Sequence, residues 1–181
     1  HKEYRRQRQM CIRDRYSETV SSITGAGSIT LGENSTDTTN VLTFGGCGCT
    51  ATFSGVISEA GSITKLGGGT TTLSGANTYT GTTTISAGTI ILSSSNERLS
   101  NSTAVSVSTG ATLTLNVSET VGSIAGGGTV RLVFGDLTAG GDDTSTTFSG
   151  SMTAGGQFTK VGSGTLTMSG ASTFTGPLTI S

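Results

Sequence analysis

One segment of the chain occurs twice, and this internal repeat limits the possible fold more than any other feature. Residues 53–86 align with residues 148–181 at a constant offset of 95, with 19 identities in 34 positions. The best-matched part reads KLGGGTTTLSGANTYTGTTTIS in the first copy and KVGSGTLTMSGASTFTGPLTIS in the second. Self-similarity of this kind is typical of repeat architectures, in which one small unit cannot bury its own apolar face and stacks on its neighbour.

A second pair of segments extends the repeat toward the N-terminus. Residues 17–31 and 118–132 both begin with the tetrapeptide SETV, at an offset of 101. The offset then falls to 95 because residues 32–52 are six residues longer than residues 133–147, which indicates a surface loop insertion. We therefore divide the chain into one long unit, residues 17–116, and a partial second unit, residues 117–181.

Residues 1–16 (HKEYRRQRQMCIRDRY) differ in composition from everything that follows. They contain six of the ten basic residues and have no counterpart in the second unit. Because the string QMCIRDRY is similar to a translated sequencing adapter, we expect a non-native leader; a genuine basic arm is the alternative. Beyond the leader, four basic residues stand against nine acidic ones, a balance that does not favour nucleic acid as a partner.

Thr, Ser and Gly make up half of the chain, and the apolar residues alternate with them in short runs. Such alternation has the two-residue period of a β-strand, and β-branched residues favour a pleated surface. Glycine-containing pairs and triplets between the runs supply turns. We predict an all-β chain with strands at residues 28–31, 41–44, 50–54, 62–66, 70–74, 82–86, 89–93, 104–108, 111–116, 128–134, 146–148, 158–161, 165–169 and 178–180.

A sandwich, a barrel and a solenoid all fit this spacing of strands and turns. The pattern G-x-G-T-x-T-x-S-G-A-x-T-x-T-G, which occurs in both copies, favours a right-handed parallel β-helix (β-solenoid). In that fold equivalent strands stack about 4.8 Å apart, so like residues align in ladders. At about 20 residues per coil, residues 17–181 would form roughly eight coils. The expected core is a narrow column of Ile29, Leu73, Ile85, Ile90, Leu92, Val105, Val107, Leu113 and Leu115.

The segment GGGTTTLSGANTYTGTTTISAGTIIL (residues 67–92) resembles the passenger-associated transport repeat, also called the autotransporter-associated β-strand repeat. Residues 53–70 and 102–130 are similar to other parts of such passengers. The resemblance implies a fragment of a type V secretion passenger, a β-helical rod at the Gram-negative cell surface, tethered to the outer membrane. It also implies one partner, the protein's own C-terminal outer-membrane β-barrel, which this fragment lacks. We expect no direct membrane insertion, because no stretch approaches the roughly 20 apolar residues of a membrane helix.

Candidate catalytic groups are few in this sequence. Beyond the leader, Asp142 and Asp143 are the only adjacent acidic residues, and we interpret them as a solvated loop; a cation or catalytic site is the alternative. The single histidine is His1, in the leader, so we expect no Ser/His/Asp site.

Two other motifs have alternative interpretations. Cys47 and Cys49 are predicted to be loop cysteines, free or joined by a local disulfide; the alternative is half of a zinc site. The glycine runs at residues 67–69 and 126–128 lack the G-K-[ST] of a phosphate loop, so we predict turns. The threonine triplets at residues 70–72 and 82–84 are interpreted as strand filler; an ice-binding surface is the alternative.

These observations predict no catalytic residue, no metal site and no cofactor site, and hence no enzymatic activity. The leading hypothesis is a structural and secretion module, a surface-exposed stalk that supports passenger folding and secretion. The alternative is an adhesin that binds host or neighbouring-cell ligands through the loops at residues 32–52 and 135–147. A polysaccharide-degrading β-helix is the third hypothesis.

Overall fold

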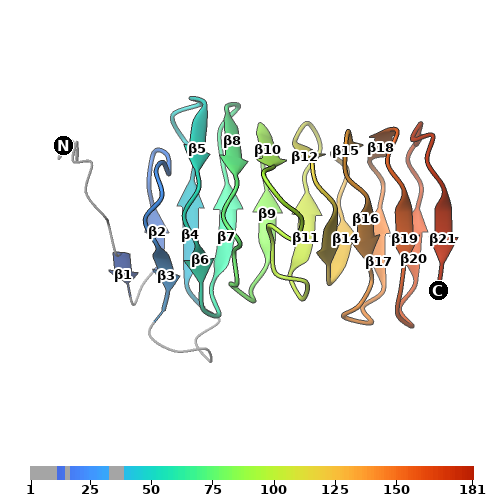
Figure 1. Cartoon of the computed structure of the whole chain (residues 1–181), viewed down its shortest axis with the longest axis horizontal. Helices are drawn as coiled ribbons and strands as arrows, with labels where there is room; N and C mark the ends of the chain where they lie inside the picture. Colours follow the sequence, from blue (N-terminus) through green and yellow to red (C-terminus); the bar gives the residue numbers. More distant parts are fainter. Residues whose placement is uncertain (1–11, 15–16, 33–38) are drawn as a thin grey trace.

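The computed structural model describes residues 12–14, 17–32 and 39–181, and it folds them into a β-solenoid of about eight coils (Figure 1). Every strand pairing among these residues is parallel, which confirms the predicted all-β parallel architecture. Within the described ranges, no helix is long and apolar enough to span a membrane.

The strands form three faces along the solenoid, because each coil passes once through each face. The first face contains β2 (Glu18–Thr19), β4 (Val41–Phe44), β7 (Ser62–Lys65), β9 (Thr83–Ile85), β11 (Ala104–Val107), β14 (Ser123–Ala125), β17 (Thr146–Phe148) and β20 (Leu166–Met168). The second face contains β5 (Ala51–Phe53), β8 (Thr70–Leu73), β10 (Thr89–Leu92), β12 (Thr112–Leu115), β15 (Thr129–Leu132) and β18 (Ser151–Ala154).

The third face is divided into two sheets. The first sheet holds β1 (Ile12–Asp14), β3 (Ile29–Leu31) and β6 (Ile57–Ser58). The second sheet holds β13 (Glu119–Val121), β16 (Leu137–Ala139), β19 (Phe158–Lys160) and β21 (Leu178–Ile180). Between the two sheets, residues 77–79 and 98–99 occupy the same face without forming strands.

All fourteen predicted strands are present, with boundaries within two residues of those expected. Seven further strands were not predicted: β1, β2, β6, β13, β14, β16 and β18. They have only two to four residues each, too few for a two-residue period to stand out. They form because the neighbouring coil already offers a strand with which to pair.

The core is a column of apolar side chains that runs through the coils. Each of the nine residues predicted for it is at most 5% exposed. On the second face Leu73, Leu92, Leu115 and Leu132 are paired in sequence, one coil after another, and all are fully buried. Burial of a leucine side chain stabilises a fold by about 1.5–3 kcal/mol, so this ladder contributes substantially to the cohesion between coils.

Hydroxyl side chains form ladders on the outside of the solenoid. Thr19, Thr43, Thr64 and Thr84 are paired consecutively on the first face, and the third face carries a similar threonine ladder. The middle residue of the triplet at 70–72, Thr71, instead faces the core and is 1% exposed. Thr83, the middle residue of the triplet at 82–84, is likewise buried, so in each triplet only the first and third threonines face outward.

Glycines occupy the corners where one coil lies directly against the next. The runs at residues 67–69 and 126–128 lie at such corners, which confirms that they are turns. A Cβ built on Gly75 would lie 1.7 Å from the carbonyl oxygen of Gly55 in the preceding coil. Since real atoms never approach so closely, the coils can stack at this spacing only if the corner residue has no side chain.

Coil length varies within a limited range along the chain. Successive strands of a face are offset by 17 to 24 residues, except that Ile29 pairs with Ile57, 28 residues later. The six-residue insertion belongs to this coil, and its residues 33–38 lie outside the described ranges. The offset of 95 residues between the two copies of the repeat is not a whole number of coils. Equivalent strands of the two copies therefore lie on different faces, β7 on the first face and β19 on the third.

The predicted leader, residues 1–16, lies outside the described residues except for β1. That strand pairs in parallel with β3, from Ile12 with Ile29 to Asp14 with Leu31.

Candidate functional site

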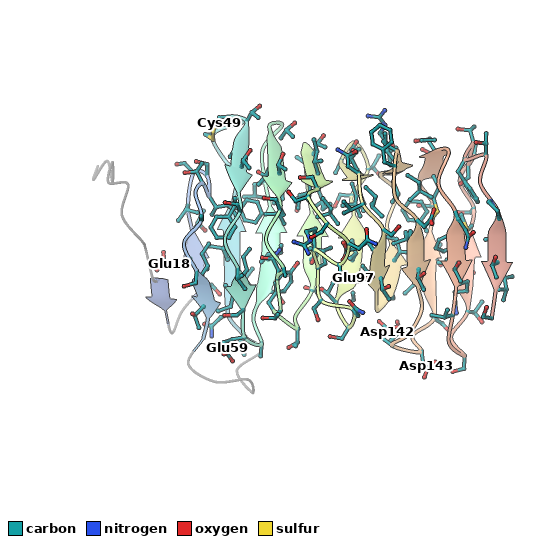
Figure 2. All side chains as sticks on the ribbon, in the orientation of Figure 1. Glu18, Cys49, Glu59, Glu97, Asp142 and Asp143 are labelled. Atoms are coloured by element: carbon teal, nitrogen blue, oxygen red, sulfur yellow. A yellow bond between two sulfur atoms is a disulfide. The ribbon has the colours of Figure 1, made fainter. Side chains whose placement is uncertain are left out.

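The carboxylates do not converge on one site. Glu18, Glu59, Glu97, Asp142 and Asp143 are distributed along the length of the solenoid (Figure 2). Within the described ranges, no three His, Cys, Asp or Glu residues are close enough together to hold a metal ion. Three further acidic residues of the sequence, Glu3, Glu33 and Asp37, lie outside those ranges.

Asp142 and Asp143 lie in the loop between β16 and β17, and each binds its own local partners. Asp142 Oδ1 accepts hydrogen bonds from the backbone N–H and the hydroxyl of Thr144, at 3.0 and 2.7 Å. Asp143 Oδ1 accepts the backbone N–H of Ser163 in the next coil at 2.7 Å, and this bond holds the pKa of Asp143 below its usual value. The two side chains thus stabilise neighbouring turns, which supports the loop interpretation over a shared cation site.

Glu119 is the most unusual titratable group in the described structure. Its side chain is 2% exposed, and its carboxylate accepts the backbone N–H groups of Arg98, at 2.8 Å, and Leu99, at 2.7 Å. Burial raises the pKa of Glu119 to about 7, although these two hydrogen bonds act in the opposite direction. Since both carboxylate oxygens are occupied by backbone donors, the group bridges two coils where strand pairing is interrupted.

Asn77 fills the same gap one coil earlier. Its Oδ1 accepts the backbone N–H of Ile57 at 2.9 Å, and its Nδ2 donates to the carbonyl oxygens of Gly75 and Arg98. In the second copy of the repeat Ser172 takes the equivalent position, and its Oγ accepts the N–H of Met152 at 3.1 Å. Side chains therefore replace missing strand-to-strand hydrogen bonds, Asn77 on the third face and Ser172 beside β18 on the second, as buried backbone groups require.

A hydrogen-bonded chain of hydroxyl groups lies inside the core beside this gap. The fully buried Tyr79 hydroxyl is 2.5 Å from Thr83 Oγ1, which in turn is 3.3 Å from Thr103 Oγ1. Thr103 Oγ1 donates to the carbonyl oxygen of Gly81, so the chain ends on the backbone. Burial raises the pKa of Tyr79, and the phenol remains neutral. Among the described residues, every buried side-chain N or O atom has a hydrogen-bond partner, and this network is therefore a structural element.

Two lysines hold turns in the two copies of the repeat. Lys65 is fully buried between coils, and its ammonium group donates to the carbonyl oxygens of Leu66 and Gly67. Lys160 makes the same pair of bonds, to Val161 and Gly162. Burial lowers the pKa of Lys65. In both copies the ammonium group thus satisfies carbonyl oxygens of the turn that follows the lysine.

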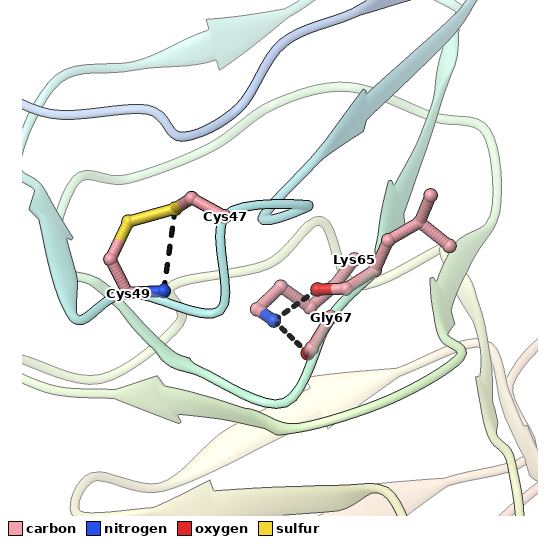
Figure 3. Close-up of a disulfide and its surroundings, with 5 residues drawn as sticks. Cys47, Cys49, Lys65 and Gly67 are labelled. Carbon is pink, nitrogen blue, oxygen red and sulfur yellow. Dashed lines mark hydrogen bonds between the residues drawn. A yellow bond between two sulfur atoms is a disulfide. The ribbon is translucent and has the colours of Figure 1, made fainter.

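Cys47 and Cys49 are joined by a disulfide at an exposed corner between β4 and β5 (Figure 3). The prediction left open free thiols, a local disulfide and half of a zinc site; the disulfide leaves neither sulfur as a thiolate for zinc. The backbone N–H of Cys49 donates to Cys47 Sγ at 3.3 Å. Both residues are exposed, in contrast to the buried polar groups described above.

The groups that sequence reasoning missed are the buried polar ones: Glu119, Asn77 and Lys65. Lys65 and Glu119 both recur in the other copy of the repeat, as Lys160 and Glu18, but only the two lysines make equivalent contacts in both copies. All three side chains are buried. The shallow pocket bounded by Ser123 and Ala139 is too small to admit a water molecule. The arrangement can fix the stacking of coils.

Comparison with known proteins identifies the repeated segment. Residues 63–92 and 158–181 match the family model described as Passenger-associated-transport-repeat. No curated protein and no solved structure matches the chain. The matched segments run from β7 to β10 and from β19 to the C-terminus, so each spans somewhat more than one coil.

Proposed function

From the premise that this chain carries two passenger-associated-transport repeats, we propose that it is a stalk segment of a Gram-negative autotransporter passenger. In this role it lies outside the cell, tethered to the outer membrane by the translocator domain of its parent protein. Its task is mechanical: it extends the passenger from the surface and supports its folding during secretion. It performs no catalysis of its own.

The observation that carries this proposal is the continuity of the coil-to-coil contacts. Overlapping parallel ladders on the three faces together connect the coils from β2 to β21, and the apolar column runs along them, so each coil offers the next one a parallel edge and an apolar surface. In a solenoid, stability is a sum of repeat and nearest-neighbour terms, so folding can propagate from one end. A chain that emerges from a pore gradually can therefore fold coil by coil outside, without its complete sequence.

The test is surface display of the segment between a signal peptide and a bacterial translocator domain. Leu73→Asp places a charge in the fully buried leucine ladder, whereas Thr72→Asp places the same charge on the outward side of the same strand. We expect Leu73→Asp to reduce protease-accessible passenger at the cell surface at least several-fold and Thr72→Asp to leave it near the unmodified level. Equal display of both variants would show that coil stacking does not assist secretion.

A second candidate function, adhesion, is favoured by one observation. Phe134, at the corner after β15, is 84% exposed, and Arg131 on the same strand is also exposed. Exposed aromatic and arginine side chains are enriched at binding hot spots. If this corner and the adjoining loop at residues 135–147 bind host or neighbouring-cell ligands, Phe134→Ala will reduce cell adhesion without reducing display. Unchanged adhesion in a variant displayed at the normal level would eliminate this candidate.

A further inference from the structure

The disulfide of Cys47 and Cys49 lies at an outer corner of the solenoid. All residues from 46 to 50 are exposed, so both sulfur-bearing side chains are on the surface. The bridge joins residues only two positions apart in the sequence. It therefore connects no distant parts of the chain, and it closes a loop far too short to restrict the unfolded chain strongly.

The corner keeps its shape through other contacts. The backbone N–H groups of Gly45 and Cys47 both donate to the carbonyl oxygen of Ser21 in the preceding coil, at 3.1 and 3.3 Å. The N–H of Gly48 donates to the carbonyl oxygen of Gly45 at 3.1 Å, which closes the turn. These bonds involve the backbone alone and do not require a bond between the sulfurs.

The next corners of the same edge support this conclusion. Gly67 and Gly88 occupy the equivalent positions in the two following coils, with positive φ angles of 62° and 69°, against 89° at Gly45. A Cβ built on Gly67 would lie 2.2 Å from the carbonyl oxygen of Gly45, so the turns stack directly. Neither of these later corners contains a cysteine. The same edge therefore closes its turns without a disulfide.

The two sulfurs are chemically unequal. Cys47 Sγ accepts a hydrogen bond from the backbone N–H of Cys49, and such a donor stabilises a thiolate more than a neutral sulfur. Since the better leaving group in disulfide exchange is the more stable thiolate, Cys47 is the sulfur that leaves.

We propose that the Cys47–Cys49 disulfide is a thiol-exchange site that takes up a low-molecular-weight thiol on Cys49. The incoming thiolate attacks Cys49 Sγ, a new S–S bond forms there, and the Cys47–Cys49 bond breaks. The electron pair of the broken bond goes to Cys47 Sγ, which becomes the thiolate that the Cys49 N–H holds. One disulfide replaces another, so no further oxidant or reductant is needed. The inference is independent of the stalk role, because it rests on this corner alone.

The experiment uses the full chain with Cys11→Ser, so that only these two cysteines remain. The protein is treated with reduced glutathione and quenched with N-ethylmaleimide, which caps the freed thiol, and adducts are mapped by tandem mass spectrometry. We expect glutathione on Cys49 and maleimide on Cys47 in about ten-fold excess or more over the reverse, as one hydrogen bond to a charged group implies. No mixed disulfide, an even distribution, or glutathione mainly on Cys47 would overturn the proposal.

A matched control and a stability measurement separate exchange from a structural role. In Cys11→Ser with Cys47→Ser no disulfide exists, so reduced glutathione should leave Cys49 unmodified. The melting temperature of the Cys11→Ser protein should fall by less than about 5 °C when its disulfide is fully reduced, because the closed loop is so short. Loss of the folded state on reduction would show instead that the bridge is structural and would contradict the proposal.

Discussion

Glu119 gives the solenoid an unusual dependence of stability on pH. Its side chain is almost completely buried and has a pKa of about 7 in the folded protein, against a value of 4.5 in the absence of structure. Between these two pH values the folded protein binds more protons than the unfolded chain. Stability from this group is therefore fully present below pH 4.5 and is lost as the pH rises through 7.

The magnitude follows from the same two pKa values. Between pH 5 and pH 8, Glu119 should lower the free energy of unfolding by about 2 to 3 kcal/mol, since one pKa unit corresponds to about 1.4 kcal/mol. The assay is urea unfolding monitored by circular dichroism at several pH values in that range. The pKa values of Asp142 and Asp143 are lowered in the folded protein, so these two groups make the free energy of unfolding fall as the pH decreases. Their effect occurs only at more acidic pH.

Two variants decide whether Glu119 is responsible. Glu119→Gln should be less stable at every pH, because an amide cannot accept both backbone N–H groups, but its stability should vary little between pH 5 and 8. Glu18→Gln is the matched control, since Glu18 occupies the same SETV tetrapeptide in the first unit and is exposed; it should retain the pH dependence of the unmodified protein. If Glu119→Gln keeps the full pH dependence, the reasoning is refuted.

Three further predictions concern the coil-to-coil contacts and can be checked by chemical unfolding. Leu73→Ala should cost about 2–5 kcal/mol, because it opens a cavity in a fully buried ladder, while outward Thr72→Ala should change stability by less than about 0.5 kcal/mol; similar losses for both would contradict the assigned faces. Gly75→Ala should cost more than about 3 kcal/mol because no space exists for the Cβ, whereas Gly68→Ala, which meets nothing within 4 Å, should be tolerated; the reverse order would be incompatible with the stacked corners. Asn77→Ser should be more stable than Asn77→Ala, since serine performs the equivalent bridging role in the second copy; a serine variant no better than alanine would count against side-chain bridging.

The architecture could be predicted from the sequence because the coils repeat the same pattern of alternating polar and apolar residues. Alternation of Thr with Leu or Val identifies strands such as β12, and recurrence of the pattern at matching positions favours parallel stacking over hairpins. Short strands were missed where local sequence carries no period. Leu137–Ala139, for example, is an isolated apolar-polar-apolar triplet, and it is a strand because β13 and β19 flank it.

The buried polar groups could not be predicted for a different reason. Glu18 and Glu119 lie in identical tetrapeptides, yet the first is exposed and the second is 2% exposed. The difference comes from the preceding coil, where Arg98 and Leu99 present backbone N–H groups that no strand satisfies. The burial of Glu119 therefore depends on the missing strand partner in the neighbouring coil. The residues concerned are some 20 positions away in the chain, so the tetrapeptide itself does not reveal it.

The cysteine pair illustrates the limit of motif reasoning. The spacing of Cys47 and Cys49 allows free thiols, a disulfide or a partial metal site, and only the structure joins the two sulfurs. The unequal environment of the two sulfurs depends on one backbone N–H group, a feature without any sequence signature.

The measurement that tests the parallel solenoid most directly is a set of spin-label distances along one outward ladder. Thr52, Thr72, Ile91, Thr114, Arg131 and Thr153 follow one another at successive steps on the second face. In a variant with all three cysteines replaced, labels at residue 52 and at residue 131 or 153 should be separated by about 19 and 24 Å, which correspond to four and five strand spacings. Distances that do not increase by this constant step would contradict the parallel coil-on-coil arrangement.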